Sequence, residues 1–272
     1  MCTRQNFRLE NSNIGAYILA LVITFLVGHS NPSSATITPI QNSKNSHKCP
    51  SQLFCFEISG QITQSDNKEL ARAVALVKEA KAVPLFRLNS AGGDVEVAIA
   101  IGRELRRMRA TAITWDDGQC SSSCVFILAG AVRRILSKNI GIHRPYSSRT
   151  DNRDYQAIQL DQRQLAKFAK DYLHEVNVSP SLYDAMISIP PEKIKLLSDS
   201  ELDSYGLLKL DPVEQELDDS ADARKYGLTK LEYLRRKAQI SITCANEYGF
   251  GSSSGDFDSY NKCSANVLST RK

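Results

Sequence analysis

A run of three serines lies between two cysteines and leads directly into the apolar segment VFILAGA; the run reads Cys120, Ser121, Ser122, Ser123, Cys124. A serine at the start of a helix is usually an N-cap that accepts a backbone hydrogen bond. One cap needs only one serine, however, and a serine here can also use the positive end of the helix dipole to stabilise an alkoxide or an oxyanion. The segment is therefore either a capping turn or a candidate nucleophile for acyl transfer.

A serine nucleophile needs a base, and histidine is the usual one. The chain has four histidines. His29 lies in an N-terminal apolar region, His47 in a polar linker and His174 on a charged helix. His143 ends the apolar stretch Ile-Gly-Ile and precedes Arg-Pro. Taken alone it is more often a structural histidine, but together with the serine run it becomes the candidate base.

A second turn with chemical potential is NSAGG, residues 89–93, at the start of another expected helix. Gly92 and Gly93 allow positive φ and leave backbone N–H groups unobstructed beside the helix N-terminus, which suits an oxyanion or a phosphate. The simpler interpretation is a tight turn from strand to helix. GxGxxG and GxxxxGK motifs are absent, and no paired CxxC or HxxxH clusters occur, so we expect neither a cofactor nor a metal.

Hydrophobic periodicity predicts the elements that must position these residues. Strands are expected at 54–59, 83–89, 111–115, 133–136 and 140–143, and helices at 66–80, 94–108 and 123–131. Such β-α-β repetition predicts an α/β fold with a parallel sheet packed by helices. Ligands bind such sheets at the carboxyl ends of the strands, where both turns and His143 fall.

The rest of the chain divides around this core. We expect a polar linker at 36–50, one domain at 51–211 and a charged helical extension with a Gly/Ser-rich tail at 212–272, the tail having little regular structure. Within the domain, helices are expected at 151–175, 180–187 and 199–205, with a last strand at 207–210. The composition is ordinary for a globular protein, with a net charge of +4, so nothing demands nucleic acid as a partner.

The first 35 residues have the order of a secretory signal peptide. Arg4 and Arg8 precede the apolar run 14–28. A stretch that ends in small residues at Ala35 follows, and cleavage is expected after Ala35. The alternative is an uncleaved anchor that touches the membrane only through residues 14–28. Both interpretations place the domain outside the cytoplasm, in the periplasm, secreted, or membrane-anchored.

Six cysteines remain after removal of Cys2, and they form three pairs that are local in sequence. In an oxidising compartment we expect the bonds Cys49–Cys55, Cys120–Cys124 and Cys244–Cys263. The middle bond would hold Ser122 at the apex of a small loop; the alternative is two buried thiols.

Four segments in order resemble those of the Clp-type serine protease (ClpP) family, within the ClpP/crotonase-like superfamily. LNSAGGDVEVAIAIGREL resembles its INSPGG turn, GQCSSSCVFILAGA its GQAAS nucleophile elbow, IGIHRP its IHQP segment, and LSDSELDSYGLL its closing LSAxEAxxYGLVD segment. The resemblance covers roughly residues 53–210 and is strongest to an exported branch of the superfamily.

This resemblance implies Ser122 as nucleophile, His143 as base, and the backbone N–H groups of Gly92 and Ser123 as oxyanion donors. The family's third triad member, an aspartate, corresponds to Ile194. Its replacement is left open; candidates are Asp151, Asp154 and Asp199.

The resulting hypothesis is an exported serine hydrolase, peptidase-like, that acts on a peptide or protein by acyl transfer. The resemblance also implies a homo-oligomer, whereas the chain has no ATPase motif and no ATPase partner is expected. The first alternative is a catalytically impaired module that binds peptides along a sheet edge. Two others are a crotonase-type acyl-thioester enzyme and a cysteine hydrolase using Cys120 or Cys124.

Overall fold

The computed structural model describes residues 36–40, 49, 53–145, 154–248 and 257–269. The expected signal peptide or anchor, residues 1–35, lies outside the described residues. In the parts that are described, no helix combines the length and the apolar character needed to cross a membrane.

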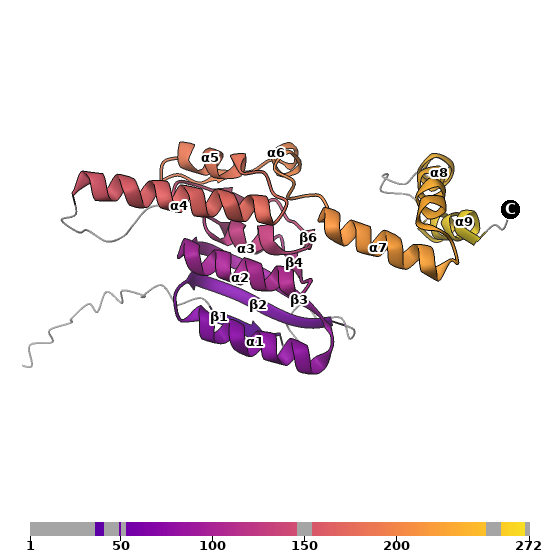
Figure 1. Cartoon of the computed structure of the whole chain (residues 1–272), viewed down its shortest axis with the longest axis horizontal. Helices are drawn as coiled ribbons and strands as arrows, with labels where there is room; N and C mark the ends of the chain where they lie inside the picture. Colours follow the sequence, from indigo (N-terminus) through magenta and orange to yellow (C-terminus); the bar gives the residue numbers. More distant parts are fainter. Residues whose placement is uncertain (1–35, 41–48, 50–52, 146–153, 249–256, 270–272) are drawn as a thin grey trace, which may run out of the picture. The chain divides into compact units, whose positions relative to one another are not determined.

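Parallel strands form the centre of the domain (Figure 1). The long strand β3 (Val83–Gly93) pairs in parallel with β2 (Leu53–Ile62) on one side and with β4 (Thr111–Ile113) on the other, and β4 pairs with β6 (Arg133–Ile135). A short antiparallel strand, β1 (Thr36–Pro39), extends the sheet beyond β2.

The end of β3 also belongs to a second group of strands. Ser90 pairs with Cys120 of β5 (Cys120–Ser121), which pairs in parallel with β7 (Ile140–Ile142), and β8 (Lys195–Leu196) closes this group in the antiparallel sense. β3 is therefore the strand that connects the main sheet to the strands carrying the serine run and His143.

Helices follow the strands as the sequence predicts. The described helices are α1 (Asp66–Ala80), α2 (Val95–Arg107), α3 (Cys124–Gly130), α4 (Tyr155–Glu175), α5 (Ser181–Ser188), α6 (Asp199–Ser204), α7 (Pro212–Lys225), α8 (Lys230–Tyr248) and α9 (Phe257–Ser269). The prediction of an α/β fold with a mostly parallel sheet packed by helices is confirmed.

The helix that follows the serines, α3, lies at the centre of the core, and all of its residues are buried. A Cβ on Gly130 would stand 2.1 Å from the carbonyl oxygen of Gly102, so only glycine lets α3 approach α2 this closely. The hydroxyl of Tyr172 on α4 donates to the carbonyl of Phe126 at 2.8 Å. Burial raises the pKa of Tyr172, which keeps this donor protonated.

The carboxyl end of α3 is fixed by Arg134, which the sequence analysis did not single out. Its guanidinium donates to five backbone carbonyls at the end of α3 and in the segment after α6: Ala129, Ala131, Gly206, Leu207 and Lys209. Burial lowers the pKa of Arg134 to about 10, so the side chain stays charged at neutral pH.

Three boundary predictions are wrong. Part of the expected linker 36–50 is β1, because Ile37 is apolar enough to pack on the core beside α1. The expected strand at 207–210 is absent from the described structure: its backbone carbonyls are taken by Arg134, and the last strand is β8 instead. The expected unstructured tail contains α9, because Leu268 and Cys263 pack in a second small core.

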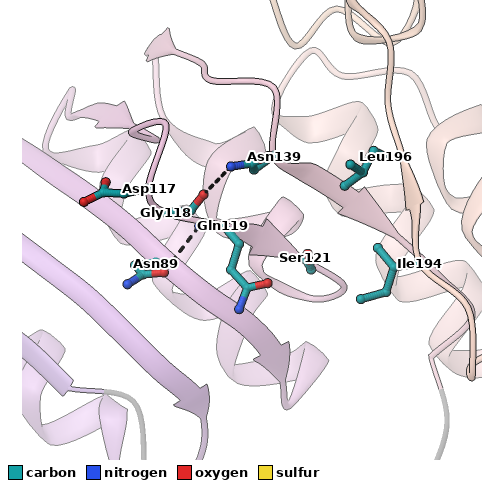
Figure 2. Close-up of a pocket in the computed structure, with 8 residues that line it drawn as sticks. All are labelled: Asn89, Asp117, Gly118, Gln119, Ser121, Asn139, Ile194 and Leu196. Carbon is teal, nitrogen blue, oxygen red and sulfur yellow. Dashed lines mark hydrogen bonds between the residues drawn. The ribbon is translucent and has the colours of Figure 1, made fainter.

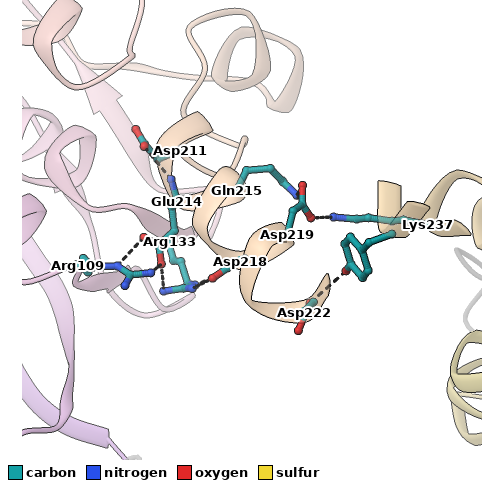
Figure 3. A network of polar contacts seen from close by, with 10 residues as sticks. Arg109, Arg133, Asp211, Glu214, Gln215, Asp218, Asp219, Asp222 and Lys237 are labelled. Atoms are coloured by element: carbon teal, nitrogen blue, oxygen red, sulfur yellow. Dashed lines mark hydrogen bonds and ion pairs between the residues drawn. The ribbon is translucent and has the colours of Figure 1, made fainter. Parts of the chain in front are cut away.

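That second core belongs to the extension, which begins at α7. Its buried residues are Ala223, Tyr233, Ile240, Cys244 and Leu268, and a disulfide joins Cys244 to Cys263. Glu214 on α7 joins the extension to the main domain, since its carboxylate accepts hydrogen bonds from Arg109 at 2.8 Å and pairs with Arg133 at 2.5 Å (Figure 3).

Candidate active site

Ser122 occupies the turn between β5 and α3 in a conformation that L residues rarely adopt. Its φ is +56°, in the left-handed region, and its exposed fraction is only 8%. A serine in a sharp strand-to-helix turn of this kind is the hallmark of a nucleophile elbow, in which the hydroxyl is held away from the regular backbone.

The elbow is held from two sides. The predicted disulfide between Cys120 and Cys124 is present and joins the end of β5 to the start of α3, with 5.2 Å between the Cα atoms and both residues fully buried. The backbone N–H of Ser122 donates to the carbonyl of Gly141 on β7 at 2.9 Å. These contacts stabilise the unusual φ of Ser122. The other two predicted disulfides, Cys49–Cys55 and Cys244–Cys263, are also present.

The other two serines of the run have different surroundings. Ser121 lies beside Gly141 and Ile194, since a Cβ on Gly141 would stand 2.8 Å from Ser121 Oγ and 2.6 Å from Ile194 Cγ2. The hydroxyl of Ser123 is fully buried and has no hydrogen-bond partner in the structure. Ser123 precedes α3 without a side-chain capping bond, so the simple interpretation of this serine as a cap is wrong.

Gly92 packs directly on the elbow. A Cβ at this position would lie 2.6 Å from Ser122 Cβ and 3.0 Å from the backbone nitrogen of Ser123, and the φ of Gly92 is +103°. Glycine is therefore required both for the conformation and for the space. This contact brings the GG turn at the end of β3 and the start of α3 together, as the sequence analysis expected.

The two expected oxyanion donors differ in whether their N–H groups already have an acceptor. The backbone N–H of Ser123 donates to no acceptor in the described part of the chain. The N–H of Gly92 donates to Ser90 Oγ at 3.1 Å, and Ser90 in turn donates to the carbonyl of Gly60 at 2.6 Å. Ser90 was not expected to take part, and no sequence pattern distinguishes it from an ordinary turn serine.

His143 directly follows β7, the strand that pairs in parallel with β5. Ser121 is in register with Gly141, so Ser122 and His143 follow the carboxyl ends of adjacent strands. His143 has an exposed fraction of 9%, and its Nδ1 lies 3.0 Å from the carbonyl oxygen of Arg144. The register thus brings the expected nucleophile and the expected base to the same end of two adjacent strands.

Ile194, which the resemblance aligns with the family's aspartate, is located by the strand register. In the antiparallel pairing of β7 with β8, Ile142 is opposite Lys195 and Gly141 is opposite Leu196, so the same register places Ile194 opposite His143. Of the candidate replacements, Asp151 lies outside the described residues. Asp154 caps α4, where its side chain accepts from the backbone N–H of Gln156, and Asp199 begins α6.

A cavity of about 540 Å³ lies on the face of the strands that Ser121 occupies (Figure 2). Amide side chains, one carboxylate and two aliphatic side chains line it together with backbone: Asn89, Asp117, Gly118, Gln119, Ser121, Asn139, Ile194 and Leu196. Asn139 Nδ2 donates to the carbonyl of Gly118 at 3.0 Å and so shapes its wall. In the described parts of the chain, no group of His, Cys, Asp or Glu side chains could hold a metal ion.

A mostly parallel sheet with a serine elbow at the carboxyl end of one strand is an α/β arrangement shared by several classes of serine hydrolase. The model of the Clp protease family matches residues 52–209, more than half of the sequence, and the chain belongs to that family. Among solved structures, it is similar to a mutant of the 1510-N membrane-bound stomatin-specific protease, with a TM-score of 0.46 and 15% identity, over 62% of this chain and 84% of that one. No curated protein matches the chain.

Proposed function

We propose that the chain is an exported serine hydrolase of peptidase type, with Ser122 as nucleophile and His143 as base. The observation that carries the proposal is the left-handed conformation of Ser122 at the turn from β5 to α3, packed against Gly92 and followed by an N–H group that has no acceptor among the described residues. Membership of the Clp protease family supports a peptide or protein as substrate.

In the proposed reaction, Ser122 Oγ attacks the carbonyl carbon of the substrate while His143 Nε2 takes the hydroxyl proton. The tetrahedral oxyanion is stabilised by the N–H of Ser123 and, once it exchanges its bond to Ser90, by the N–H of Gly92. The bond to the leaving nitrogen then breaks as His143 returns the proton to it. Water, deprotonated by His143, finally hydrolyses the acyl-serine ester.

Export and self-association are part of the same proposal. Three disulfides support an oxidising compartment, since such bonds persist outside the cytoplasm. Residues 1–35 would then act as a signal peptide or as an anchor through residues 14–28. Family membership supports a homo-oligomer, and we propose no ATPase, nucleic acid or cofactor as a partner.

The experiment is labelling of the purified full chain with a fluorophosphonate probe, which forms a covalent bond with activated serines. We expect the wild type to be labelled and Ser122→Ala to be unlabelled, with His143→Gln strongly reduced. Ser121→Ala is the matched control, because its side chain occupies the opposite face of the strand next to Ile194. Labelling that survives Ser122→Ala would overturn the assignment of the nucleophile.

A second candidate is a binding module that has lost catalysis. It is favoured by Ile194 at the position of the acid and by the engagement of the Gly92 N–H with Ser90. Absence of labelling in the folded wild type, combined with measurable binding of unstructured peptides, would favour this function over the hydrolase.

A further inference from the structure

The cavity beside the serine turn carries one uncompensated charge. Among the side chains that line it, only that of Asp117 is charged. Asp117 is exposed, and its carboxylate forms no ion pair or hydrogen bond with the described residues. Two lysines adjoin lining residues in the sequence, but Lys138 does not line the cavity and Lys195 pairs with Glu201 at 2.5 Å. The cavity is therefore negative and can accommodate a cation.

Hydrogen bonds fix how the amide side chains of the cavity are oriented. Asn139 Nδ2 donates to the carbonyls of Asp116 and Gly118 at 2.9 and 3.0 Å, which leaves Oδ1 as an acceptor for a ligand. The side chain of Gln119 has no hydrogen-bond partner among the described residues, so its Oε1 is a further acceptor. Asn89 Oδ1 accepts from the backbone N–H of Gln119 at 3.3 Å, so Asn89 offers its NH₂ group instead, which suits a carbonyl of a bound peptide.

The other end of the cavity is aliphatic and adjoins the serine turn. Ile194 and Leu196 line it with exposed fractions of 55% and 56%. A Cβ on Gly141 would stand 2.6 Å from Ile194 Cγ2 and 2.8 Å from Ser121 Oγ, so both side chains lie against the same glycine. Ser121 directly precedes the proposed nucleophile. In Figure 2, Asp117 lies at the opposite end of the cavity from the two aliphatic side chains, with the amides between them.

This order of groups matches a long side chain with an aliphatic stem and a cationic head. The stem of a lysine or arginine packs on apolar surface, whereas its head only donates hydrogen bonds and needs acceptors. We propose that the cavity binds a lysine or arginine side chain of the peptide substrate, and that Asp117 selects its positive charge. The inference rests on the proposed function and adds the class of substrate to it.

The first experiment measures peptide binding and does not depend on catalysis. It uses the full chain with Ser122→Ala and fluorescent, unstructured peptides that differ only at one central position, which is lysine, arginine or norleucine. Norleucine keeps an aliphatic stem but has no charge. We expect the lysine and arginine peptides to bind about tenfold more tightly than the norleucine peptide, as one partly exposed hydrogen-bonded ion pair allows.

Two variants assign this preference to one carboxylate. Adding Asp117→Asn to Ser122→Ala should abolish the preference for lysine over norleucine, and Asp117→Lys should replace it with a preference for a glutamate peptide. Asp116→Asn is the matched control. Asp116 is the neighbouring exposed carboxylate, but it does not line the cavity, and its backbone carbonyl still accepts from Asn139 in the variant. This control should retain the preference.

The second experiment tests whether the cavity selects substrates for the proposed reaction. Two peptidyl diphenyl phosphonates, which react covalently with activated serines, differ only in carrying a lysine or a norleucine side chain next to phosphorus. We expect the wild type to react about tenfold faster with the lysine probe, and this ratio to fall towards one in Asp117→Asn.

The outcomes separate the two proposals. Equal affinities for the lysine and norleucine peptides, or no measurable binding of either, would overturn the role of the cavity, as would an equal effect of Asp116→Asn. A wild type that reacts with both probes at one rate would also overturn it while leaving the hydrolase standing. A wild type that reacts with no probe, yet binds basic peptides in a manner that depends on Asp117, would overturn only the hydrolase.

Discussion

The backbone N–H of Ser122 donates to the carbonyl of Gly141 at 2.9 Å, which ties the serine turn to the strand that leads to His143. The bond has two effects on the candidate site. It occupies the N–H of Ser122, so that the N–H of Ser123 is the next donor of the turn and has no acceptor in the part of the chain that the structure describes. It also fixes the distance between two strand ends that are far apart in sequence, and hence the relative position of the proposed nucleophile and base.

Replacement of Gly92 by alanine tests the close packing of the two turns. The new Cβ would meet Ser122 Cβ at 2.6 Å in a residue with a φ of +103°. We expect a loss of roughly 1–3 kcal/mol in the free energy of unfolding, together with a loss of labelling. Gly206→Ala is the control, because Gly206 also has a positive φ, +82°, but its nearest neighbour is 3.4 Å away. Denaturant titration and probe labelling measure the two effects; equal labelling of both variants would contradict the prediction.

The bond between Cys120 and Cys124 is expected to support the site more than the fold. Closing so short a loop stabilises by about 2 kcal/mol in the chain-entropy model. We expect the double variant Cys120→Ala/Cys124→Ala to fold but to label roughly 10- to 100-fold more slowly, because Ser122 loses one of the constraints on its left-handed turn. The pair Cys244→Ala/Cys263→Ala is the control and should leave labelling intact. Undiminished labelling of the first variant would make its disulfide purely structural.

Ile194→Asp is expected to complete the site. A carboxylate opposite His143 would stabilise the imidazolium that forms when Ser122 is deprotonated. The labelling rate should rise at least about tenfold, a part of the roughly 10⁴-fold that a triad aspartate contributes elsewhere. Ile194→Asn is the control for polarity without charge. A rise in both variants, or in neither, would argue against the electrostatic explanation.

Glu214 is expected to dominate the attachment of α7 to the domain (Figure 3). Its exposed fraction is 2%, whereas its partners Arg109 and Arg133 are partly exposed. Glu214→Ala leaves both cations without this carboxylate, and solvent screens part of the loss, so we expect a decrease of roughly 1–2 kcal/mol in the free energy of unfolding. Glu216→Ala, which removes an exposed ion pair with Lys230, should change it by less than about 0.5 kcal/mol. Urea titrations of the two variants compare them directly.

The carboxylate of Asp211 is expected to stabilise the fold at neutral pH and to lose this effect in acid. Burial alone would raise its pKa, but the hydrogen bond from Asn177 and the ion pair with Arg106 outweigh burial and lower the pKa below its usual value. The stabilisation is therefore complete above the unfolded pKa of about 3.9 and is lost as pH falls through the lower folded pKa. The difference in melting temperature between wild type and Asp211→Asn should be constant from pH 5 to 7 and shrink on acidification below about pH 4. A difference independent of pH would exclude this role.

The sequence predicted the elements of the domain well because their apolar periodicity is strong. Helices 66–80 and 94–108 and strands 83–89 and 140–143 lie within a few residues of the observed α1, α2, β3 and β7. The prediction failed at 207–210, where tertiary contacts determine the backbone conformation. This stretch is apolar like a strand, but its carbonyls accept hydrogen bonds from the guanidinium of Arg134. Local pattern cannot anticipate such a long-range partner.

The candidate site was likewise predicted from the sequence only in part. The serine run, the GG turn and His143 were predicted because glycines and serines at strand ends carry chemical meaning on their own. Ser90 was missed because its role depends on the backbone carbonyl of Gly60, which no side-chain pattern marks. The replacement of the acid at Ile194 was visible only through the resemblance, and the strand register then placed that residue opposite His143.

β3 belongs to both groups of strands, which limits the insertions and deletions that its sequence can accept during evolution. It pairs with β2 from Val83 to Gly93, its first half also pairs with β4, and its end pairs with β5 at Ser90 and packs on the serine turn through Gly92. A single inserted or deleted residue would turn every following side chain to the opposite face and separate Gly92 from Ser122. Length variation among related sequences should therefore concentrate outside this strand, and the spacing from Val83 to Gly93 should be among the least tolerant of insertion.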